Sequence, residues 1–162
     1  VVIGSIVAGR RRREFEDMMG YCVNTVALRS ELSEGLTGHE LLKQIRRVVI
    51  DAYDHQDLQF EEVIEALSLQ RARQLSSLFN VMMVCEDDPL STLSIKDLEI
   101  THLPWEPTAS EFDLVLMVFN RLDGLDLAFL HDSTIFEDWD SWRSSFMSFS
   151  RNLRPVSINF HC

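Results

Sequence analysis

The sequence contains little cysteine, little positive charge and no long apolar run. Its three cysteines, Cys22, Cys85 and Cys162, lie far apart and form no C-x-x-C pair, so the sequence predicts neither a zinc site nor a disulfide framework. The 15 lysines and arginines face 26 acidic residues, which gives a net charge of -11. Such a chain is repelled by nucleic acid and by anionic lipid, so we expect no nucleic acid or membrane partner. A reducing cytoplasm fits the cysteine usage best.

The usual catalytic signatures are absent as well. No two of the five histidines are adjacent, and the sequence holds no H-E-x-x-H, G-x-S-x-G or Walker-type phosphate loop. No apolar run approaches the roughly 20 residues that span a bilayer. The first residue is valine, from which we expect a fragment of a longer protein or a processed product. Composition and spacing alone therefore indicate a globular lobe of unknown function.

Strand and helix patterns alternate along the chain. Apolar, β-branched runs predict strands at 1–8, 22–28, 78–85, 98–103, 112–119 and 125–131. Capping boxes at 37–40 and 134–137 predict the starts of two long helices, and a shorter helix is expected at about 60–67. This order predicts an α/β (α+β) fold in which helices pack on a mixed sheet.

Two further stretches each admit two interpretations. The run Arg10-Arg11-Arg12-Arg13 fits a localisation or phosphate-binding signal, but a solvated turn after a strand is favoured in so acidic a chain. The last helix carries aromatic residues at helical spacing, among them Trp142 and Phe146. These could bind a partner, but core packing is the favoured interpretation.

Several stretches resemble the condensation domains of nonribosomal peptide synthetases. Residues 19–29, M-G-Y-C-V-N-T-V-A-L-R, are similar to that family's G-x-F-V-N-T-x-x-x-R motif, and residues 55–61, H-Q-D-L-Q-F-E, to its H-Q-D-x-P-F-E motif. Shorter similarities at 3–10, 78–82 and 111–114 make the resemblance collinear from about residue 3 to 150. It assigns 1–151 to the C-terminal lobe of such a domain and leaves 152–162 as a divergent tail. Gln59 replaces the family's proline, and 71–78 lacks its aspartate and second arginine.

The resemblance implies one lobe of a chloramphenicol acetyltransferase-like fold. Two lobes would enclose a tunnel for phosphopantetheine arms that carry a donor acyl thioester and an acceptor amine, which react to form an amide. The family's H-H-x-x-x-D-G motif belongs to the N-terminal lobe and is absent here, so no catalytic residue, metal or directly bound cofactor is predicted. The implied partners are the N-terminal lobe, peptidyl carrier proteins and an adenylation domain. The irregular stretch 103–111 is expected to cross to the other lobe.

The resemblance also supplies the candidate site residues. Those expected at the tunnel or lobe interface are Asn24, Thr25, Arg29, His55, Gln56 and Asp57, and those expected to be structural are Arg10, Gly20, Phe60 and Glu61. Whether Asn24 lines the tunnel or satisfies buried backbone groups stays open.

Roles for three charged side chains follow from their chemistry. Asp57 is interpreted as a helix cap in preference to a substrate contact, and Arg10 and Arg29 as partners of carboxylates. Two other functions remain possible: a non-catalytic lobe that docks carrier proteins, and a lobe of a coenzyme A-dependent acyltransferase. The two motifs favour the synthetase over the acyltransferase, and only sequence upstream of the chain separates the synthetase from the docking lobe.

Overall fold

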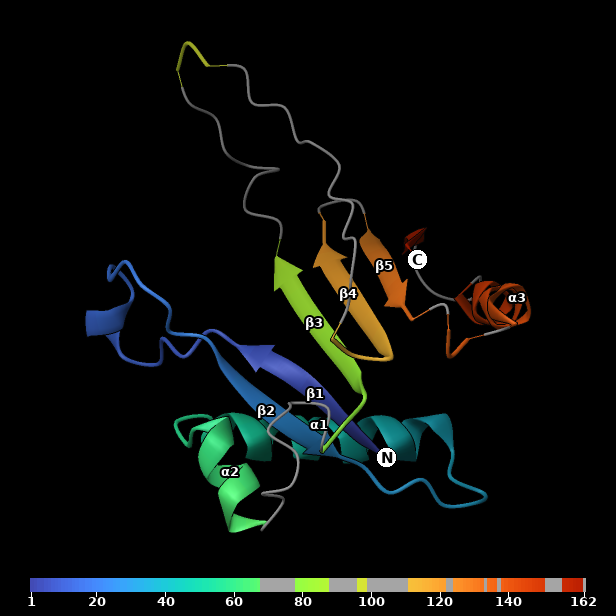
Figure 1. The fold of residues 1–162 in the computed structure, drawn as a ribbon, viewed down its shortest axis with the longest axis horizontal. Helices are drawn as coiled ribbons and strands as arrows, with labels where there is room; N and C mark the ends of the chain where they lie inside the picture. The colour runs from blue at the N-terminus through green and yellow to red at the C-terminus, as the bar shows by residue number, and fades with distance from the viewer. Residues whose placement is uncertain are drawn as a thin grey trace. The chain divides into compact units, whose positions relative to one another are not determined.

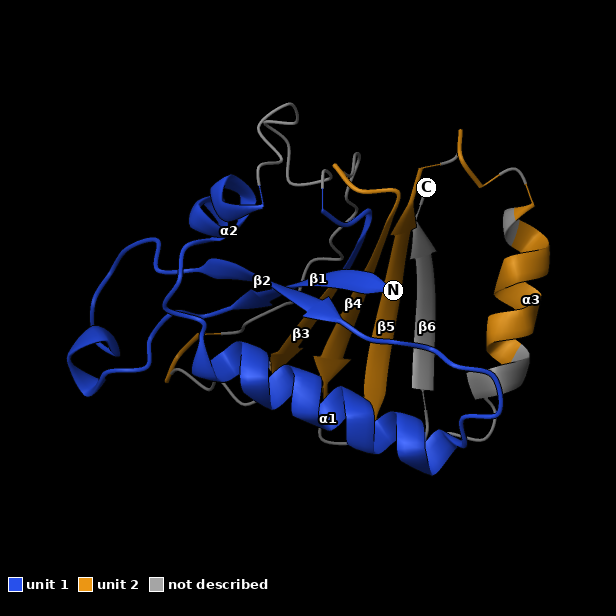
Figure 2. Cartoon of the chain, turned by 90° about the horizontal axis from the view of Figure 1, so that it is seen from below, with its two compact units in different colours: residues 1–82 blue, residues 83–162 orange. Residues whose placement is uncertain are grey.

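A computed structural model describes residues 1–67, 78–87, 96–98, 111–121, 124–132, 134–136, 138–150 and 156–161. The chain forms two compact units, 1–82 and 83–162, shown in different colours in Figure 2. Three features discussed from the sequence lie outside the described residues, except for one end residue of each. They are the expected strand at 98–103, the expected crossing at 103–111 and the divergent stretch 71–78. Within the described residues, no helix is both long and apolar enough to cross a membrane.

The first unit is built on an antiparallel pair of strands. β1 (Val2–Val7) pairs with β2 (Asn24–Arg29), so that Ser5 lies opposite Val26 and Val7 opposite Asn24. Two helices follow, α1 (Gly38–Asp54) and α2 (Phe60–Ala66), and both contact β2 (Figure 1). The strand predicted at 1–8 is confirmed as β1. The strand predicted at 22–28 corresponds to β2, which begins two residues later, at Asn24.

The start of α1 matches its predicted capping box. The backbone N–H of Glu40 donates to Thr37 Oγ1 over 3.3 Å, and the backbone N–H of Thr37 donates to Glu40 Oε2 over 2.9 Å. Two donors that the helix itself leaves without partners are thereby satisfied. The Thr37 hydroxyl also donates to Glu40 Oε2 over 2.6 Å, and this bond, followed by the one from the Thr37 backbone N–H, holds the pKa of Glu40 below its usual value.

The core of the first unit includes a close contact between a strand and two aromatic rings. Phe60 and Phe79 are each 4% exposed, and their ring centroids lie 5.6 Å apart. A Cβ added to Gly4 on β1 would lie 2.1 Å from the Phe79 ring. The absence of a side chain at Gly4 therefore allows the ring to approach the strand.

The second unit contains a mixed sheet. β3 (Val81–Asp87), which begins at the end of the first unit, is followed across the sheet by β4 (Leu114–Asn120), β5 (Leu125–His131) and β6 (Val156–His161). β4 and β5 are antiparallel, and hydrogen bonds between the backbones of Arg121 and Gly124 close their turn. β5 and β6 are parallel. The predicted hairpin and the mixed α/β architecture are confirmed, but β6 was not predicted.

α3 (Trp139–Ser150) begins later than the capping-box pattern at 134–137 predicts, so that prediction was wrong. Thr134 instead donates through both its N–H and its hydroxyl to the carboxylate of Asp132, 2.8 and 2.6 Å away. These bonds lower the pKa of Asp132 and hold Thr134 in a turn. At the true start, the Ser141 N–H donates to Asp138 Oδ1 over 3.3 Å. The other member of the predicted box, Glu137, lies outside the described residues.

Aromatic residues of α3 pack on β5. Phe129 of β5 is the most deeply buried large side chain among the described residues. Its ring meets those of Trp142 and Phe146 edge to face, with centroids 6.4 and 4.7 Å away. Phe146 is half-buried but Trp142 is 43% exposed, so the prediction of core packing holds only in part.

Candidate functional site

Asn24 joins the two sequence motifs. Its side chain lies at the first residue of β2 and is 8% exposed. Nδ2 donates to the carbonyl oxygens of Gln56 and Leu58, 2.8 and 2.7 Å away, and Oδ1 accepts from the N–H of Thr25 over 2.9 Å. All of these partners are backbone groups. The structure therefore places Asn24 as a clamp on the turn between α1 and α2, in agreement with the second of its two interpretations.

The two residues that open the second motif bond back to α1. His55 follows the last residue of the helix, and its Nδ1 lies 2.8 Å from the carbonyl oxygen of Asp51. Because a carbonyl only accepts, this geometry places a proton on Nδ1 and, in the neutral ring, leaves Nε2 as an acceptor. The amide of Gln56 donates to the carbonyl oxygen of Tyr53 over 2.8 Å. Both side chains thus satisfy carbonyls at the C-terminal end of α1.

Asp57 does not cap α2, contrary to the interpretation favoured from the sequence. The residue at the N-cap position is Gln59, and its side chain makes no capping hydrogen bond. Asp57 instead forms an ion pair with Arg11 across 3.6 Å, with side chains that are 78% and 42% exposed respectively. The carboxylate is two residues too early for the cap, and the extended backbone at Gln59 turns the chain into the helix without it.

Arg11 is the residue that the sequence analysis missed. Besides pairing with Asp57, it donates from Nη1 to the carbonyl oxygen of Asp54 over 3.1 Å. It therefore holds both ends of the turn 54–58 from the segment that follows β1. Nothing in the run of four arginines distinguishes Arg11 from its neighbours, so this role depended on the three-dimensional structure.

Arg10 organises the loop that leads to the first motif. Its guanidinium donates to the carbonyl oxygens of Phe15, Met18 and Gly20, at 2.6 Å for Met18 and 3.1 Å for Gly20. Arg10 was predicted to pair with a carboxylate; the structure gives it three carbonyls instead. Gly20 has a φ of 155°, in the range that favours glycine, which is consistent with its predicted structural role.

The remaining predicted residues lie around the clamp. Thr25 follows Asn24 in β2 and is half-buried. Arg29, at the end of β2, forms an ion pair with the exposed carboxylate of Glu31 over 3.5 Å, which confirms the prediction that Arg29 pairs with a carboxylate. Phe60 is buried, whereas Glu61 in the first turn of α2 is exposed. All ten predicted site residues belong to the first unit. Whether they face a substrate tunnel stays a prediction.

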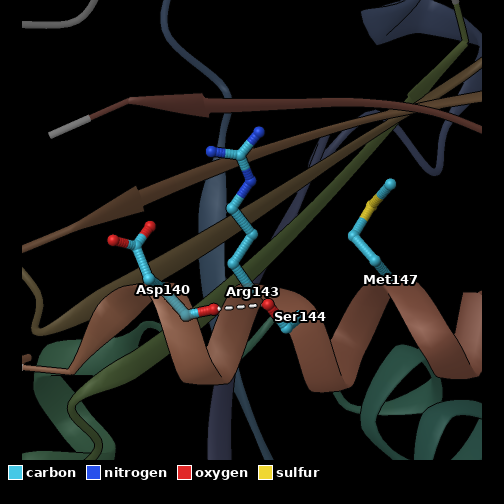
Figure 3. Close-up of a pocket in the computed structure, with 4 residues that line it drawn as sticks. All are labelled: Asp140, Arg143, Ser144 and Met147. Atoms are coloured by element: carbon cyan, nitrogen blue, oxygen red, sulfur yellow. Dashed lines mark hydrogen bonds between the residues drawn. The ribbon is translucent and has the colours of Figure 1, made fainter.

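A separate depression of about 520 Å³ lies on α3 of the second unit (Figure 3). Asp140, Arg143, Ser144 and Met147 line it from one helix face, and Ser144 Oγ donates to the carbonyl oxygen of Asp140 over 2.8 Å. None of the predicted site residues lines it. Among the described residues, no three His, Cys, Asp or Glu side chains come together in a way that could hold a metal ion.

The cysteines that the structure describes differ from each other in exposure. Cys22 and Cys85 both lie in apolar stretches of the sequence, where a free cysteine usually acts as a small buried hydrophobe, but only Cys22 is half-buried and Cys85 on β3 is exposed. Cys162 lies outside the described residues. Two isolated thiols of this kind do not form a site.

The side chains around Asn24 can hold backbone groups in position. The amides of Asn24 and Gln56 and the guanidinium of Arg10 bind backbone carbonyls. Neither an amide nor a guanidinium accepts a proton near neutral pH. These amide and guanidinium contacts can fix a turn and the strand beside it.

Comparison with known proteins identifies the family. A family model for the condensation domain matches residues 1–153. One of the linear gramicidin synthase proteins of Brevibacillus parabrevis is 40% identical over 139 residues, which cover 85% of this chain and 2% of that protein. Surfactin synthase subunit 2 of Bacillus subtilis (strain 168) is 35% identical over 161 residues, which cover 98% of this chain and 4% of that protein. The chain thus spans only a small part of these relatives.

A solved structure supports the same assignment at the level of the fold. The chain is similar to a four-domain nonribosomal peptide synthetase bound to AMP and glycine, with a TM-score of 0.64 and 23% identity. The alignment covers 77% of this chain and 11% of that one. The sequence matches and the fold agree, and the chain belongs to the condensation domain family of nonribosomal peptide synthetases.

Proposed function

We propose that the chain forms the C-terminal lobe of a condensation domain and contributes to amide bond formation within a nonribosomal peptide synthetase. In this reaction the acceptor amine attacks the donor thioester carbonyl, a C–N bond forms, the C–S bond breaks and the thiol leaves. The observation that carries the proposal is the family match over residues 1–153. The role of residues 1–151 as one lobe, with 152–162 as a divergent tail, is part of the same proposal.

The chain's own contribution would be to hold the turn 54–58 and β2 in place. Asn24 provides the hydrogen bonds that join them, and Arg11 contacts the same turn at Asp54 and Asp57. The five histidines include no adjacent pair, so the proposal assigns the base that takes the amine proton to the N-terminal lobe of the same domain. A base must lie within hydrogen-bond reach of its nucleophile, and the lobe described here would help to set that distance.

The partners of the chain belong to the proposal as well. They are the N-terminal lobe, an adjoining adenylation domain and the carrier proteins whose phosphopantetheine arms bring the two substrates. The assembly would work in the cytoplasm, which suits a chain with free thiols at Cys22 and Cys85.

The test compares the chain alone with the chain joined to the lobe encoded upstream of it. Each protein is mixed with donor-loaded and acceptor-loaded carrier proteins, and the products are followed by mass spectrometry. We expect amide formation by the joined protein and only the uncatalysed rate with the chain alone. Amide formation by the chain alone would contradict the assignment of the base to the other lobe. A joined protein that folds and binds both carrier proteins but forms no amide would favour the non-catalytic docking lobe.

A further inference from the structure

Two neighbouring arginines bind two different segments of the first unit. The guanidinium of Arg10 donates to carbonyl oxygens within the loop 10–20, which lies between β1 and β2, and the contact to Met18 measures 2.6 Å. The guanidinium of Arg11 reaches the turn 54–58 instead and donates to a carbonyl oxygen there over 3.1 Å. A single peptide bond therefore joins the residue that closes the loop to a residue that holds the turn.

The backbone on both sides of Arg11 is fixed by contacts at the loop. On one side Gly9 has a φ of 64°, and a Cβ at this position would lie 1.8 Å from the carbonyl oxygen of Cys22, so the two backbones meet closely at the neck of the loop. On the other side the N–H of Phe15 donates to the carbonyl oxygen of Arg12 over 2.9 Å. The order of the loop thus determines where the Arg11 side chain begins.

The contact of Arg11 with the turn is of a kind that depends on such a fixed starting point. Its ion pair with Asp57 is exposed and 3.6 Å long. Exposed pairs contribute little, because water screens the charges and a long side chain loses conformational freedom when it is held. A backbone that is already in place lowers this entropic cost, because fewer torsions remain to be fixed. A disordered loop would raise the cost and weaken the contact.

We propose that Arg10 and Arg11 couple the loop 10–20 to the turn 54–58, so that the order of the loop helps to maintain the order of the turn. The loop forms from its own contacts, and Arg11 passes part of that rigidity to the turn that Asn24 clamps from β2. Because coupling is reciprocal, a molecule that binds the ordered loop would steady the turn by the same factor. This inference rests on contacts within the first unit and does not depend on the proposed function.

Two glycines provide a matched pair of variants that leaves both arginines in place. Gly20 in the loop and Gly35 before α1 have φ values of 155° and 82°, and a Cβ at either position meets no other part of the chain within 4 Å. Alanine therefore strains the backbone at each position without a steric clash. We expect Gly20→Ala to raise hydrogen–deuterium exchange of the amides at 55–58 by about twofold, and Gly35→Ala to leave it unchanged. Arg10→Ala loosens the loop in a second way and should act like Gly20→Ala.

The second arm of the experiment removes the link between the two segments. In a chain that already carries Arg11→Ala, adding Gly20→Ala or Arg10→Ala should produce no further rise at 55–58, because the loop no longer contacts the turn. Circular dichroism and the amides in the middle of α1 show that each variant keeps its fold. A rise that persists in the Arg11→Ala chain would overturn the proposal, because the loop would then act by another route. So would equal rises from Gly20→Ala and Gly35→Ala, or no rise from either loop variant.

Discussion

Two connecting segments of the first unit, the loop 10–20 and the turn 54–58, are held in different ways. The loop is tied by Arg10 to carbonyls five to ten residues further along the chain. The turn is tied by Asn24 and Arg11, which come from 32 to 46 residues earlier in the sequence. Residues 11–20 are all exposed, whereas the turn leads directly into the buried Phe60.

The difference shows which segment depends on the rest of the fold. A loop closed by its own arginine can form from local contacts, and losing it costs little buried surface. A turn held by a buried amide from another strand forms only when β2 and the helices have already come together. Asn24 of the first motif and the turn residues Gln56 and Leu58 of the second meet at this second kind of connection.

The largest expected effect compares the phenylalanines of the two segments. Phe60→Ala removes a ring that packs on Phe79 and should lower the free energy of unfolding by about 3–5 kcal/mol. The matched control, Phe15→Ala in the loop, removes a ring that is 37% exposed and should cost about 0.5 kcal/mol or less. Denaturant unfolding of both variants provides the measurement. Similar losses would mean that the loop is as much a part of the core as the turn.

A smaller effect is expected at the clamp itself. Asn24→Asp keeps the size of the side chain and its acceptor for the Thr25 N–H, but it removes both donors from the carbonyls of Gln56 and Leu58. Leaving these part-buried carbonyls without donors, next to a new carboxylate, should cost about 1–3 kcal/mol. The control, Arg10→Ala, removes bonds to an exposed loop and should cost less than about 1 kcal/mol. Chemical unfolding midpoints measure both, and an unchanged midpoint for Asn24→Asp would contradict the clamp.

The smallest effect is expected at Asp57. Its pair with Arg11 is exposed and 3.6 Å long, so Asp57→Ala should cost no more than about 0.5 kcal/mol and still less in high salt. Glu31→Ala, which breaks the comparably exposed pair with Arg29, provides the control and should behave in the same way. A loss of about 1 kcal/mol or more at Asp57 that ignores salt would restore the helix-capping interpretation, since caps contribute about that much.

Local patterns predicted much of this fold. β1, β5 and the start of α1 follow from apolar runs and a capping box, because those signals act between residues close in sequence. The same kind of pattern was misleading at Thr134, where the nearby Asp132 offers a competing acceptor and the helix starts later. β6 was missed because the tail resembled no known motif, although Val156, Ile158 and Phe160 alternate with polar residues as a strand pattern requires.

The candidate site was only partly predictable. The two motifs named Asn24, His55 and Gln56, but not the bonds between them, because hydrogen bonds across 32 residues depend on how the elements meet. Asp57 was misassigned because a carboxylate just before a helix commonly caps it, whereas here an arginine from another segment lies within reach. Arg11 gave no signal at all within its run of arginines. The motifs thus named residues that lie together in the first unit, and the fold determined the contacts between them.

Hydrogen–deuterium exchange of the backbone amides at 55–58 tests the central claim most directly. One of these amides, that of Leu58, donates to the carbonyl oxygen of His55 within the turn. In Asn24→Ala their exchange should rise by about tenfold, because the turn opens locally when the clamp is lost, while in Arg11→Ala it should rise by less than about threefold. Amides in the middle of α1 serve as the internal reference and should stay unchanged in both variants. Equal rises in the two variants, or no rise in Asn24→Ala, would contradict the account in which the buried amide of Asn24 holds the two motifs together.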